Sequence, residues 1–239
     1  MHPSCLEFVS RQLDRTEVRD KTVLEVGSRN VAGDSVRPTI TALAPRTYVG
    51  VDIEAGENVD ELCDAEKLRK RFGDESFDIV VSTEMLEHVR DWRIVVSNLK
   101  NVARSGGLLV LTTRSFGFPY HGWPSDYWRY EIRDMETIFS DLTIVALEAD
   151  PLAPGVFLKA VKPQDFRELD LSNLSLFSVV KRRRTARIVT ERDARVFAVV
   201  YSPIRLVRAA CPQLLKDAVK RTALSRERRA LARTSSRER

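Results

Sequence analysis

Short apolar runs alternate with amphipathic stretches through the first two thirds of the chain. The runs have the length and composition of buried β-strands and lie at residues 22–26, 47–52, 77–82, 108–113, 142–147 and 156–161. The stretches with helical spacing lie at residues 3–19, 35–43, 65–72, 92–103 and 133–139. Alternation of strand and helix predicts an α/β domain with mostly parallel strands and right-handed crossovers. Turn residues between the last two runs predict that these two strands form an antiparallel hairpin.

The pattern changes where a polar linker follows the last run. We therefore expect a domain at residues 1–163, with an N-terminal helix, and a basic, partly helical extension at residues 164–239. Residues 194–210 mix aliphatic side chains with arginine, as in a helix at a membrane interface or one packed on its own domain or a second subunit. Pro203 would bend or split such a helix. The charged residues 225–239 are poor in large apolar side chains, which predicts a disordered end.

The charges are unevenly distributed along the chain. Residues 181–239 hold 18 Lys and Arg against 5 Asp and Glu, while the rest of the chain holds 21 against 29. A basic tail on an acidic body suggests an anionic partner, namely a membrane surface, an acidic substrate or nucleic acid. The hydrophobic content of 43% is sufficient for a folded core, which excludes a disordered chain.

Cysteine spacing and the longest apolar runs bear on the cellular compartment. Cys5, Cys63 and Cys211 form no C-x-x-C pair, so neither a disulfide framework nor a thiolate zinc site is expected. The sequence has no signal-peptide pattern and no apolar run of membrane-spanning length. We therefore expect a cytoplasmic protein, which its basic extension could hold at the inner membrane face.

The ends of the first two predicted strands carry candidate ligand-binding residues. Residues 23–33 read VLEVGSRNVAG, and the second run, YVGVD, ends in Asp52. In an open parallel sheet, ligands bind beyond the carboxyl ends of the strands, where glycine allows close approach and an acid binds ribose hydroxyls. The G-x-G-x-x-G spacing of dinucleotide folds is absent, which disfavours NAD. An acid such as Glu25 suits the cationic sulfonium of S-adenosylmethionine, which carries no phosphate.

Several motifs in a fixed order make a more specific signal than any single one. After the first turn and Asp52 come the pair Asp64-Ala65 and the run FDIVVSTEMLEHVRD. With these motifs, residues 20–162 resemble the class I S-adenosylmethionine-dependent methyltransferases of the type 11 group. The resemblance implies a Rossmann-like, doubly wound, seven-stranded sheet that binds S-adenosylmethionine. One departure is that Arg29 and Val31 stand where the family commonly has glycines, so we expect a different loop path.

The resemblance also implies roles for individual residues. Glu25 and Gly27 match positions at the methionine end of the cofactor, and Asp52 matches the acid that binds the ribose. Asp64 matches the acid at the adenine amine. Ser82 and Thr83, at the end of the predicted strand at residues 77–82, match positions that flank the sulfonium. The full set implied to bind the cofactor is Glu25, Gly27, Ser28, Arg29, Asp52, Ile53, Asp64, Ala65, Ser82 and Thr83.

An aromatic segment follows the predicted strand at residues 108–113. Residues 118–130 read FPYHGWPSDYWRY and concentrate five Tyr and Trp side chains. Loops at this edge of the sheet choose the substrate, and aromatic faces suit sugars and also stack on bases. The alternative is a cluster that packs the loop. The segment is similar to one in methyltransferases of polysaccharide and glycolipid biosynthesis, which favours a carbohydrate hydroxyl as acceptor.

Methyl transfer to a hydroxyl needs a group that accepts its proton. Of the three histidines, His2 lies at a terminus, whereas His88 and His121 follow neighbouring predicted strands. Either of these two could act as the general base near neutral pH. Asp126 in the aromatic segment is a third candidate for a catalytic role.

A metal site is an alternative use of the same residues. Glu84, Glu87 and His88 would share one face if their segment were helical. The E-x-x-E-H pattern resembles the metal site of ubiquinone-pathway O-methyltransferases and small-RNA 2′-O-methyltransferases, with His121 as a fourth ligand. Mg, Mn or Zn at this site would lower the pKa of the accepting hydroxyl. The same L-E-H letters also occur in metal-free relatives, where the histidine packs at a helix start.

Three functions remain open on the sequence alone. The first is an O-methyltransferase that acts on a sugar, glycan, glycolipid or related metabolite, with an anionic membrane surface as partner of the tail. The second is an RNA methyltransferase, whose basic tail would bind phosphates, although the acidic body disfavours it. The third is a non-catalytic scaffold that retains the fold. The sequence allows a homodimer.

Overall fold

The computed structural model describes residues 2–31, 33–121 and 125–199. The chain divides into two units, Met1–Thr190 and Glu191–Arg239. Of the second unit, the structure describes residues 191–199, which are helical. The remainder of the segment 194–210, the predicted disordered end and Trp123 of the aromatic segment lie outside the described residues. No described helix is long and apolar enough to cross a membrane.

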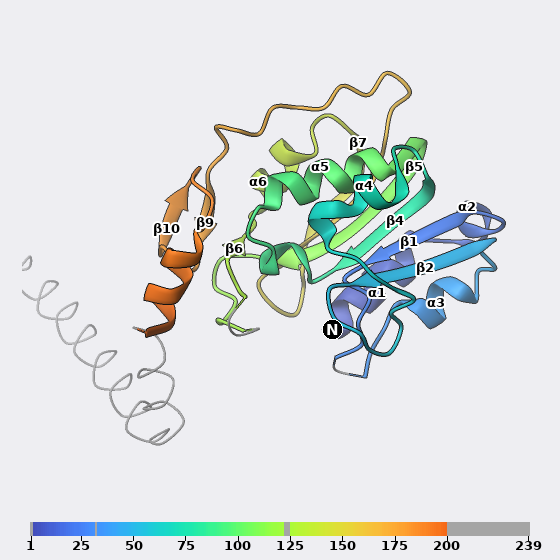
Figure 1. Cartoon of the computed structure of the whole chain (residues 1–239). Helices are drawn as coiled ribbons and strands as arrows, with labels where there is room; N and C mark the ends of the chain where they lie inside the picture. The colour runs from blue at the N-terminus through green and yellow to red at the C-terminus, as the bar shows by residue number, and fades with distance from the viewer. Residues whose placement is uncertain (1, 32, 122–124, 200–239) are drawn as a thin grey trace, which may run out of the picture. The chain divides into compact units, whose positions relative to one another are not determined.

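A seven-stranded sheet organises the first unit (Figure 1). The order is β3-β2-β1-β4-β5-β8-β7, in which β8 alone runs antiparallel to its neighbours β5 and β7. The predicted parallel sheet with a terminal antiparallel hairpin is therefore confirmed. The strands are β1 (Thr22–Val26), β2 (Thr47–Asp52), β3 (Glu61–Leu62), β4 (Phe77–Thr83), β5 (Ala103–Arg114), β7 (Thr143–Ala149) and β8 (Gly155–Val161).

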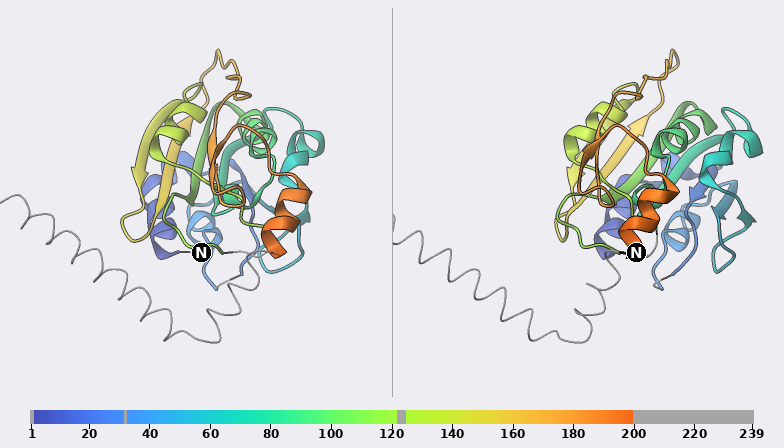
Figure 2. Two further views of the ribbon diagram at one scale, coloured as in Figure 1. Left: turned by 90° about the vertical axis from the view of Figure 1, so that its left-hand side faces the viewer. Right: turned by 60° about the vertical axis from the view of Figure 1, so that its left-hand side comes forward.

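Helices cover both faces of this sheet (Figures 1 and 2). One face carries α4 (Leu68–Phe72), α5 (Trp92–Val102) and α6 (Ile132–Ile138), and the other carries α1 (Pro3–Gln12) and α3 (Arg37–Thr41). The single helix predicted at residues 3–19 is interrupted, because the carboxylate of Asp14 caps a second short helix, α2 (Arg15–Val18). Two short 3₁₀ turns complete the layers, η1 (Ala65–Lys67) and η2 (Leu86–His88).

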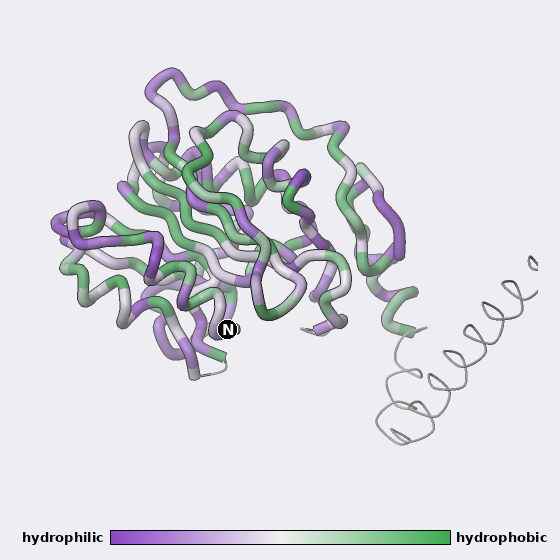
Figure 3. The backbone as a smooth tube through the Cα atoms, turned by 180° about the vertical axis from the view of Figure 1, so that it is seen from behind, coloured by the Kyte–Doolittle hydropathy of each residue, from purple (hydrophilic) through white to green (hydrophobic). Residues whose placement is uncertain are grey.

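The apolar core lies between the sheet and its helices. The central strands are hydrophobic along their length (Figure 3), and every residue of β4 is buried. Beneath α1, the rings of Phe8 and Phe157 lie 5.0 Å apart between centroids. Burial on both faces explains why the central strands read as continuous apolar runs.

The order in which strands are added to the sheet changes direction between the parallel neighbours β1 and β4. β2 and β3 lie on one side of β1, and the later strands lie on the other. The carboxyl ends of the parallel strands β1, β2, β4 and β5 meet at one edge, which is the edge where ligands bind in such sheets. Val26, Asp52, Thr83 and Arg114 end these strands.

A strap at residues 163–190 extends the first unit beyond the predicted boundary at residue 163. Its strand β9 (Leu176–Ser178) pairs with β10 (Arg183–Thr185) on one side and with β6 (Trp128–Arg129) on the other, which forms a small antiparallel sheet. The guanidinium of Arg93 on α5 donates to four strap carbonyls, at 2.7–3.2 Å, those of Leu171, Ser172, Leu174 and Ala186. These long-range contacts explain why the structure divides the chain after Thr190 rather than at the linker.

Candidate active site

Glu25 lies near the carboxyl end of β1 and is 2% exposed. Its carboxylate accepts a hydrogen bond of 2.7 Å from the hydroxyl of Tyr48 on the neighbouring β2. Burial raises the pKa of Glu25 to about 7, although the Tyr48 hydrogen bond and Arg37 act in the opposite direction. At neutral pH this carboxyl is therefore poised between its neutral and ionised forms, and a bound cation would favour ionisation.

The turn after β1 contacts the end of β2 directly. Gly27 has φ of +79°, and a Cβ there would lie 2.8 Å from the side chain of Met85, so the glycine allows the chain after β4 to approach. The carboxylate of Asp52 accepts backbone N–H bonds from Arg29 at 3.2 Å and Glu54 at 3.0 Å. The Arg29 side chain in turn forms an ion pair with Glu54. This is the loop path that replaces the missing glycines.

Several residues of the implied cofactor set make structural contacts. Ser28 is buried against β2, where a Cβ on Gly50 would lie 2.8 Å from its hydroxyl oxygen. The Ser82 hydroxyl donates to the Val26 carbonyl at 2.8 Å, which ties β4 to β1. Asp64 caps η1 by accepting from the Glu66 N–H at 3.0 Å.

Ile53, another member of that set, is exposed at the ligand-binding edge. Ile53 follows Asp52 and is 70% exposed, so an apolar side chain stands beside an acid whose orientation two backbone N–H groups fix. Thr83 ends β4 at the same edge, and Ala65 is buried behind Asp64. An oriented acid, an adjacent apolar surface and the buried Glu25 fit a cationic nucleoside without phosphates.

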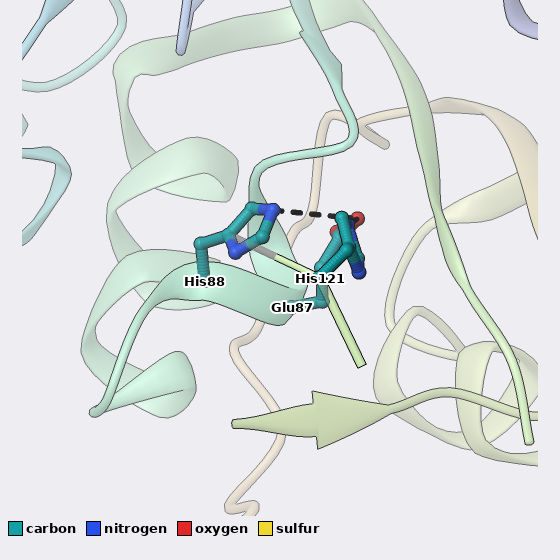
Figure 4. A group of neighbouring side chains, drawn as sticks. All are labelled: Glu87, His88 and His121. Atoms are coloured by element: carbon teal, nitrogen blue, oxygen red, sulfur yellow. Dashed lines mark ion pairs between the residues drawn. The ribbon is translucent and has the colours of Figure 1, made fainter. Parts of the chain in front are cut away.

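A second group of side chains meets beyond the ends of β4 and β5 (Figure 4). Glu87 and His88 come from η2, and His121 comes from the loop after β5. The Oε1 atom of Glu87 lies 3.7 Å from Nε2 of His121 and 4.0 Å from Nε2 of His88. The two imidazole rings lie edge to face, 4.7 Å apart between centroids. We call Glu87, His88 and His121 the EHH cluster.

Buried groups hold the cluster in place. The backbone N–H of His121 donates to Asp126 at 2.8 Å, and Nδ1 of the same histidine lies 3.2 Å from that carboxylate. Asp126 is fully buried and forms an ion pair with Arg129, which is 2% exposed. On the other side, the Thr113 hydroxyl donates to Oε2 of Glu87 at 2.9 Å.

Two carboxylates determine the protonation state of His121. Burial lowers the pKa of His121, but the carboxylates of Asp126 and Glu87 outweigh it and raise this pKa to about 9. Burial raises the pKa of Asp126, whereas Arg129 and His121 lower it to about 2. His121 is therefore an imidazolium at neutral pH. His88 donates from Nδ1 to the Ser125 carbonyl, so Nε2 is the nitrogen of this ring that can accept a proton.

Glu84 does not join the cluster, contrary to the predicted four-ligand set. The segment after β4 is not a continuous helix, because Glu84 has φ of +53° and helical geometry begins only at η2. Its carboxylate forms an ion pair with Arg114 and accepts from the His2 N–H at 2.8 Å. The potential ligand atoms of Glu87, His88 and His121 lie within 4.8 Å of one another, so three candidate metal ligands remain.

The aromatic segment is largely part of the core. Tyr127 is 7% exposed, and Trp128 and Tyr130 are fully buried, so the expected substrate contact is wrong for these three. The Trp128 indole donates to the Arg90 carbonyl and the Tyr130 hydroxyl to the Leu86 carbonyl, both at 3.1 Å. These side chains secure η2 and thereby the EHH cluster.

Sequence reasoning missed several residues that shape the site. Tyr48 and Thr113 have no motif that distinguishes them, and each acts through a partner distant in sequence. Arg129 pairs with Asp126 three residues before it, a spacing that no motif marks as an ion pair. His2 was set aside as terminal, yet its backbone reaches Glu84 at the ligand-binding edge. No signal short of the tertiary structure identifies these contacts.

Comparison with known proteins agrees with this geometry. A family model described as a methyltransferase domain matches residues 37–111, a segment that includes Asp52, Asp64 and Glu87. The fold is similar to 1,6-didemethyltoxoflavin-N1-methyltransferase of Burkholderia thailandensis, solved with S-adenosylhomocysteine (TM-score 0.53, 13% identity, 67% of this chain and 79% of that chain). No curated protein sequence matches the chain.

Two further solved structures have the same fold. One is an S-adenosylmethionine-dependent methyltransferase of Mesorhizobium loti (TM-score 0.50, 15% identity, 66% of this chain and 98% of that chain). The other is the 4+2 cyclase SpnF (TM-score 0.52, 14% identity, 66% of this chain and 80% of that chain). The chain therefore carries a match to a methyltransferase domain over residues 37–111 and has the fold of class I S-adenosylmethionine-dependent methyltransferases. At these identities the solved structures establish the fold and leave the acceptor open.

Proposed function

We propose that the protein transfers a methyl group from S-adenosylmethionine to a hydroxyl of a sugar, glycan, glycolipid or related metabolite. The observation that carries this proposal is the EHH cluster, which lies beyond the carboxyl ends of β4 and β5. An alcohol gives up its proton reluctantly, so the acceptor oxygen must lie in line with the donor methyl group and needs a base within reach of its proton. Nε2 of His88, which lies near a protonated His121 and the buried carboxylate of Glu87, would supply such a group.

The donor side of the site is assigned to the ends of β1 and β2. S-adenosylmethionine supplies an activated methyl group on a cationic sulfonium. Asp52 would accept hydrogen bonds from the ribose hydroxyls, and Ile53 would pack on the adenine. Glu25 would become ionised and balance the positive charge at the methionine end.

The acceptor side is assigned to the two histidines in different roles. His88 accepts the hydroxyl proton at Nε2, because its Nδ1 is already donating to the Ser125 carbonyl. His121 stays protonated between Asp126 and Glu87 and provides a fixed positive charge and a donor toward the acceptor oxygen. Asp126 and Arg129 orient His121 and take no part in the proton transfer.

A divalent metal at the EHH cluster is a second candidate, favoured by the proximity of one carboxylate and two imidazoles. Oxygen and nitrogen ligands of this kind suit Mg, Mn or Zn. A bound ion would lower the pKa of the accepting hydroxyl, and His121 would have to lose its proton to bind it. Methyl transfer after complete chelation, unchanged on adding back each ion, would exclude this role.

The experiment that tests the proposed function needs no known acceptor. Cell extract is incubated with the protein and isotopically labelled S-adenosylmethionine, and labelled products are identified by mass spectrometry. A labelled O-methyl group on a carbohydrate or glycolipid is expected. Labelled RNA, or label on nitrogen or carbon, would contradict the proposal. A scaffold would bind no cofactor, which calorimetry with S-adenosylmethionine detects.

We also propose that the basic extension brings this cytoplasmic enzyme to an anionic membrane surface, as a monomer or a homodimer. The positive charge of the extension comes from strap residues such as Arg183 and from the basic residues that follow in the sequence. Deletion of residues 191–239 is the suitable test, because β10 belongs to the first unit and deletion from residue 181 would remove it. Loss of binding to anionic vesicles supports the proposal, and salt-sensitive loss of RNA binding instead supports the nucleic-acid alternative.

A further inference from the structure

Arg114 ends β5 and is 1% exposed, although it carries a full positive charge. Its guanidinium forms ion pairs with Glu84, after β4, and with Asp150, before β8, the latter at 2.9 Å. The same group lies over the ring of Phe118, 4.3 Å from the centroid. One side chain therefore joins three segments that are distant in sequence.

The contact with Glu84 bears on the backbone that leads to the EHH cluster. Glu84 has φ of +53°, a left-handed conformation that costs free energy for any residue with a Cβ. Such a conformation persists only where its surroundings impose it. Here the carboxylate is held by Arg114 and by the His2 N–H, and the Glu84 N–H donates to the Thr112 carbonyl at 2.9 Å.

This left-handed turn sets the course of the following residues. Met85 comes next and fills the space over Gly27, and Glu87 then enters the cluster from η2. A change to the ordinary right-handed region at Glu84 would redirect both side chains, because every atom after it would rotate about that bond.

The contact with Phe118 reaches the other half of the cluster. The ring of Phe118 lies 4.9 Å from the ring of His121 between centroids, edge to face. The Phe118 carbonyl accepts from Arg129, the same residue that holds Asp126 against His121. Arg114 thus contacts both chain segments whose side chains meet in the cluster.

We infer that Arg114 is a positioning residue, which holds Glu87 and His121 together through the left-handed backbone of Glu84 and the ring of Phe118. Its relevance to methyl transfer rests on the function proposed above, whereas the positioning itself does not. Arginine suits this role because a planar guanidinium pairs with carboxylates and stacks on a ring at the same time. Lysine cannot do both.

The test measures the cluster geometry without a cofactor or an acceptor. The protein is labelled with ¹³C only in histidine, so signals come from three residues. The proximity of the His88 and His121 rings predicts a nuclear Overhauser effect between them. We expect Arg114→Met to lose this signal. Lys100→Met is the matched control, because Lys100 is a fully buried cation paired with Asp141 at the opposite edge of the sheet.

A pair of double variants tests the route through the backbone. Arg114→Met/Glu84→Gly and Arg114→Met/Glu84→Ala both remove the carboxylate left unpaired by the first change. Glycine adopts the left-handed conformation readily and alanine does not. The signal between the histidines is expected to return in the glycine variant and to stay weak in the alanine variant.

The outcomes divide clearly. Retention of the signal in Arg114→Met, equal loss in Lys100→Met, or equal behaviour of the two double variants would each overturn the inference. Should Arg114→Met not fold, Phe118→Leu tests the second contact, and an unchanged signal there contradicts it.

Labelled-methyl incorporation provides the functional readout: at least a tenfold fall in turnover is expected for Arg114→Met, with less than a threefold change in apparent KM for S-adenosylmethionine. If the wild-type protein formed no methylated product in this assay, the result would instead refute the proposed function.

Discussion

The hydroxyl of Tyr48 donates to the buried carboxylate of Glu25 at 2.7 Å, across the parallel pair β1 and β2. Burial of that carboxylate raises its pKa from an ordinary value of 4.5 to about 7. In the described structure, Glu25 is therefore the acid of the ligand-binding edge whose charge changes near neutral pH.

This raised pKa predicts a pH-dependent stability. Between pH 4.5 and 7 the folded protein holds a proton on Glu25 that the unfolded chain has released. The stabilisation is complete below pH 4.5 and is lost as the pH rises through 7. At about 1.4 kcal/mol per unit, the loss approaches about 3 kcal/mol. Urea unfolding at pH 5 and 7.5 should show this fall in the wild type and not in Glu25→Gln, with the exposed Glu136→Gln as control.

Cofactor binding should be linked to the same proton. A cation beside Glu25 favours the ionised carboxylate, so binding of S-adenosylmethionine below pH 7 should release a proton. Its affinity should rise between pH 5 and 7 and then level off. Calorimetry in two buffers of different ionisation enthalpy measures the release directly. An equal pH dependence in Glu25→Gln would show that another group is responsible.

Asp52 should contribute strongly to donor affinity. Two backbone N–H groups hold its carboxylate at the tip of β2, so no reorganisation is needed to meet a ribose. Hydrogen bonds to a charged group are worth about 1.5–3 kcal/mol, so Asp52→Ala should weaken binding by about tenfold or more. Glu54→Gln is the matched control, because only the backbone of Glu54 contacts Asp52. Calorimetry showing equal affinities for both variants would reject the assignment.

Loss of the proposed base should lower turnover and leave donor binding intact. We expect His88→Gln to reduce methyl incorporation by about 100-fold or more, the range found for general bases. His2→Gln serves as control, since the His2 ring contacts Ser4 and only its backbone reaches the site. If His121→Gln proved far more damaging than His88→Gln, the assignment of the two roles would have to be reversed.

The strap should depend on one guanidinium. Arg93 donates to four carbonyls, and a lysine cannot reproduce that fork. Arg93→Lys should lower the free energy of unfolding by about 1.5–3 kcal/mol, measured by urea denaturation. Exposed Arg15→Lys, changed in the same way at the surface, should have no comparable effect.

The fold was predictable because its signal is local. Continuous apolar runs such as Phe77–Thr83 mark strands buried on both faces, and the intervening helices specify parallel crossovers. The two-residue strands β3, β6 and the strap strands were not predictable, because so short a run has no periodicity of its own. Their partners can lie far away in the sequence, as Ser178 does from Trp128.

The candidate site was predictable in its residue types and only partly in its arrangement. Glu25 and Asp52 lie at the expected edge because they stand at the carboxyl ends of strands, and His88 and His121 lie there because they come in the loops after strands. Their roles as ligands of the cofactor or of an acceptor stay predictions. Glu84 was misplaced because a helical face was assumed where the chain turns with positive φ.

The chain by itself determined a doubly wound sheet with acids and histidines at the carboxyl ends of its strands. Hydrophobic periodicity and the alternation of strands with helices depend on residues that are close together in the sequence. Only the tertiary structure decided which of these groups meet and in what state of charge. Burial and distant partners raise the pKa of Glu25, keep His121 protonated between Asp126 and Glu87, and pair Glu84 with Arg114. Such effects depend on distances between segments that are far apart along the chain.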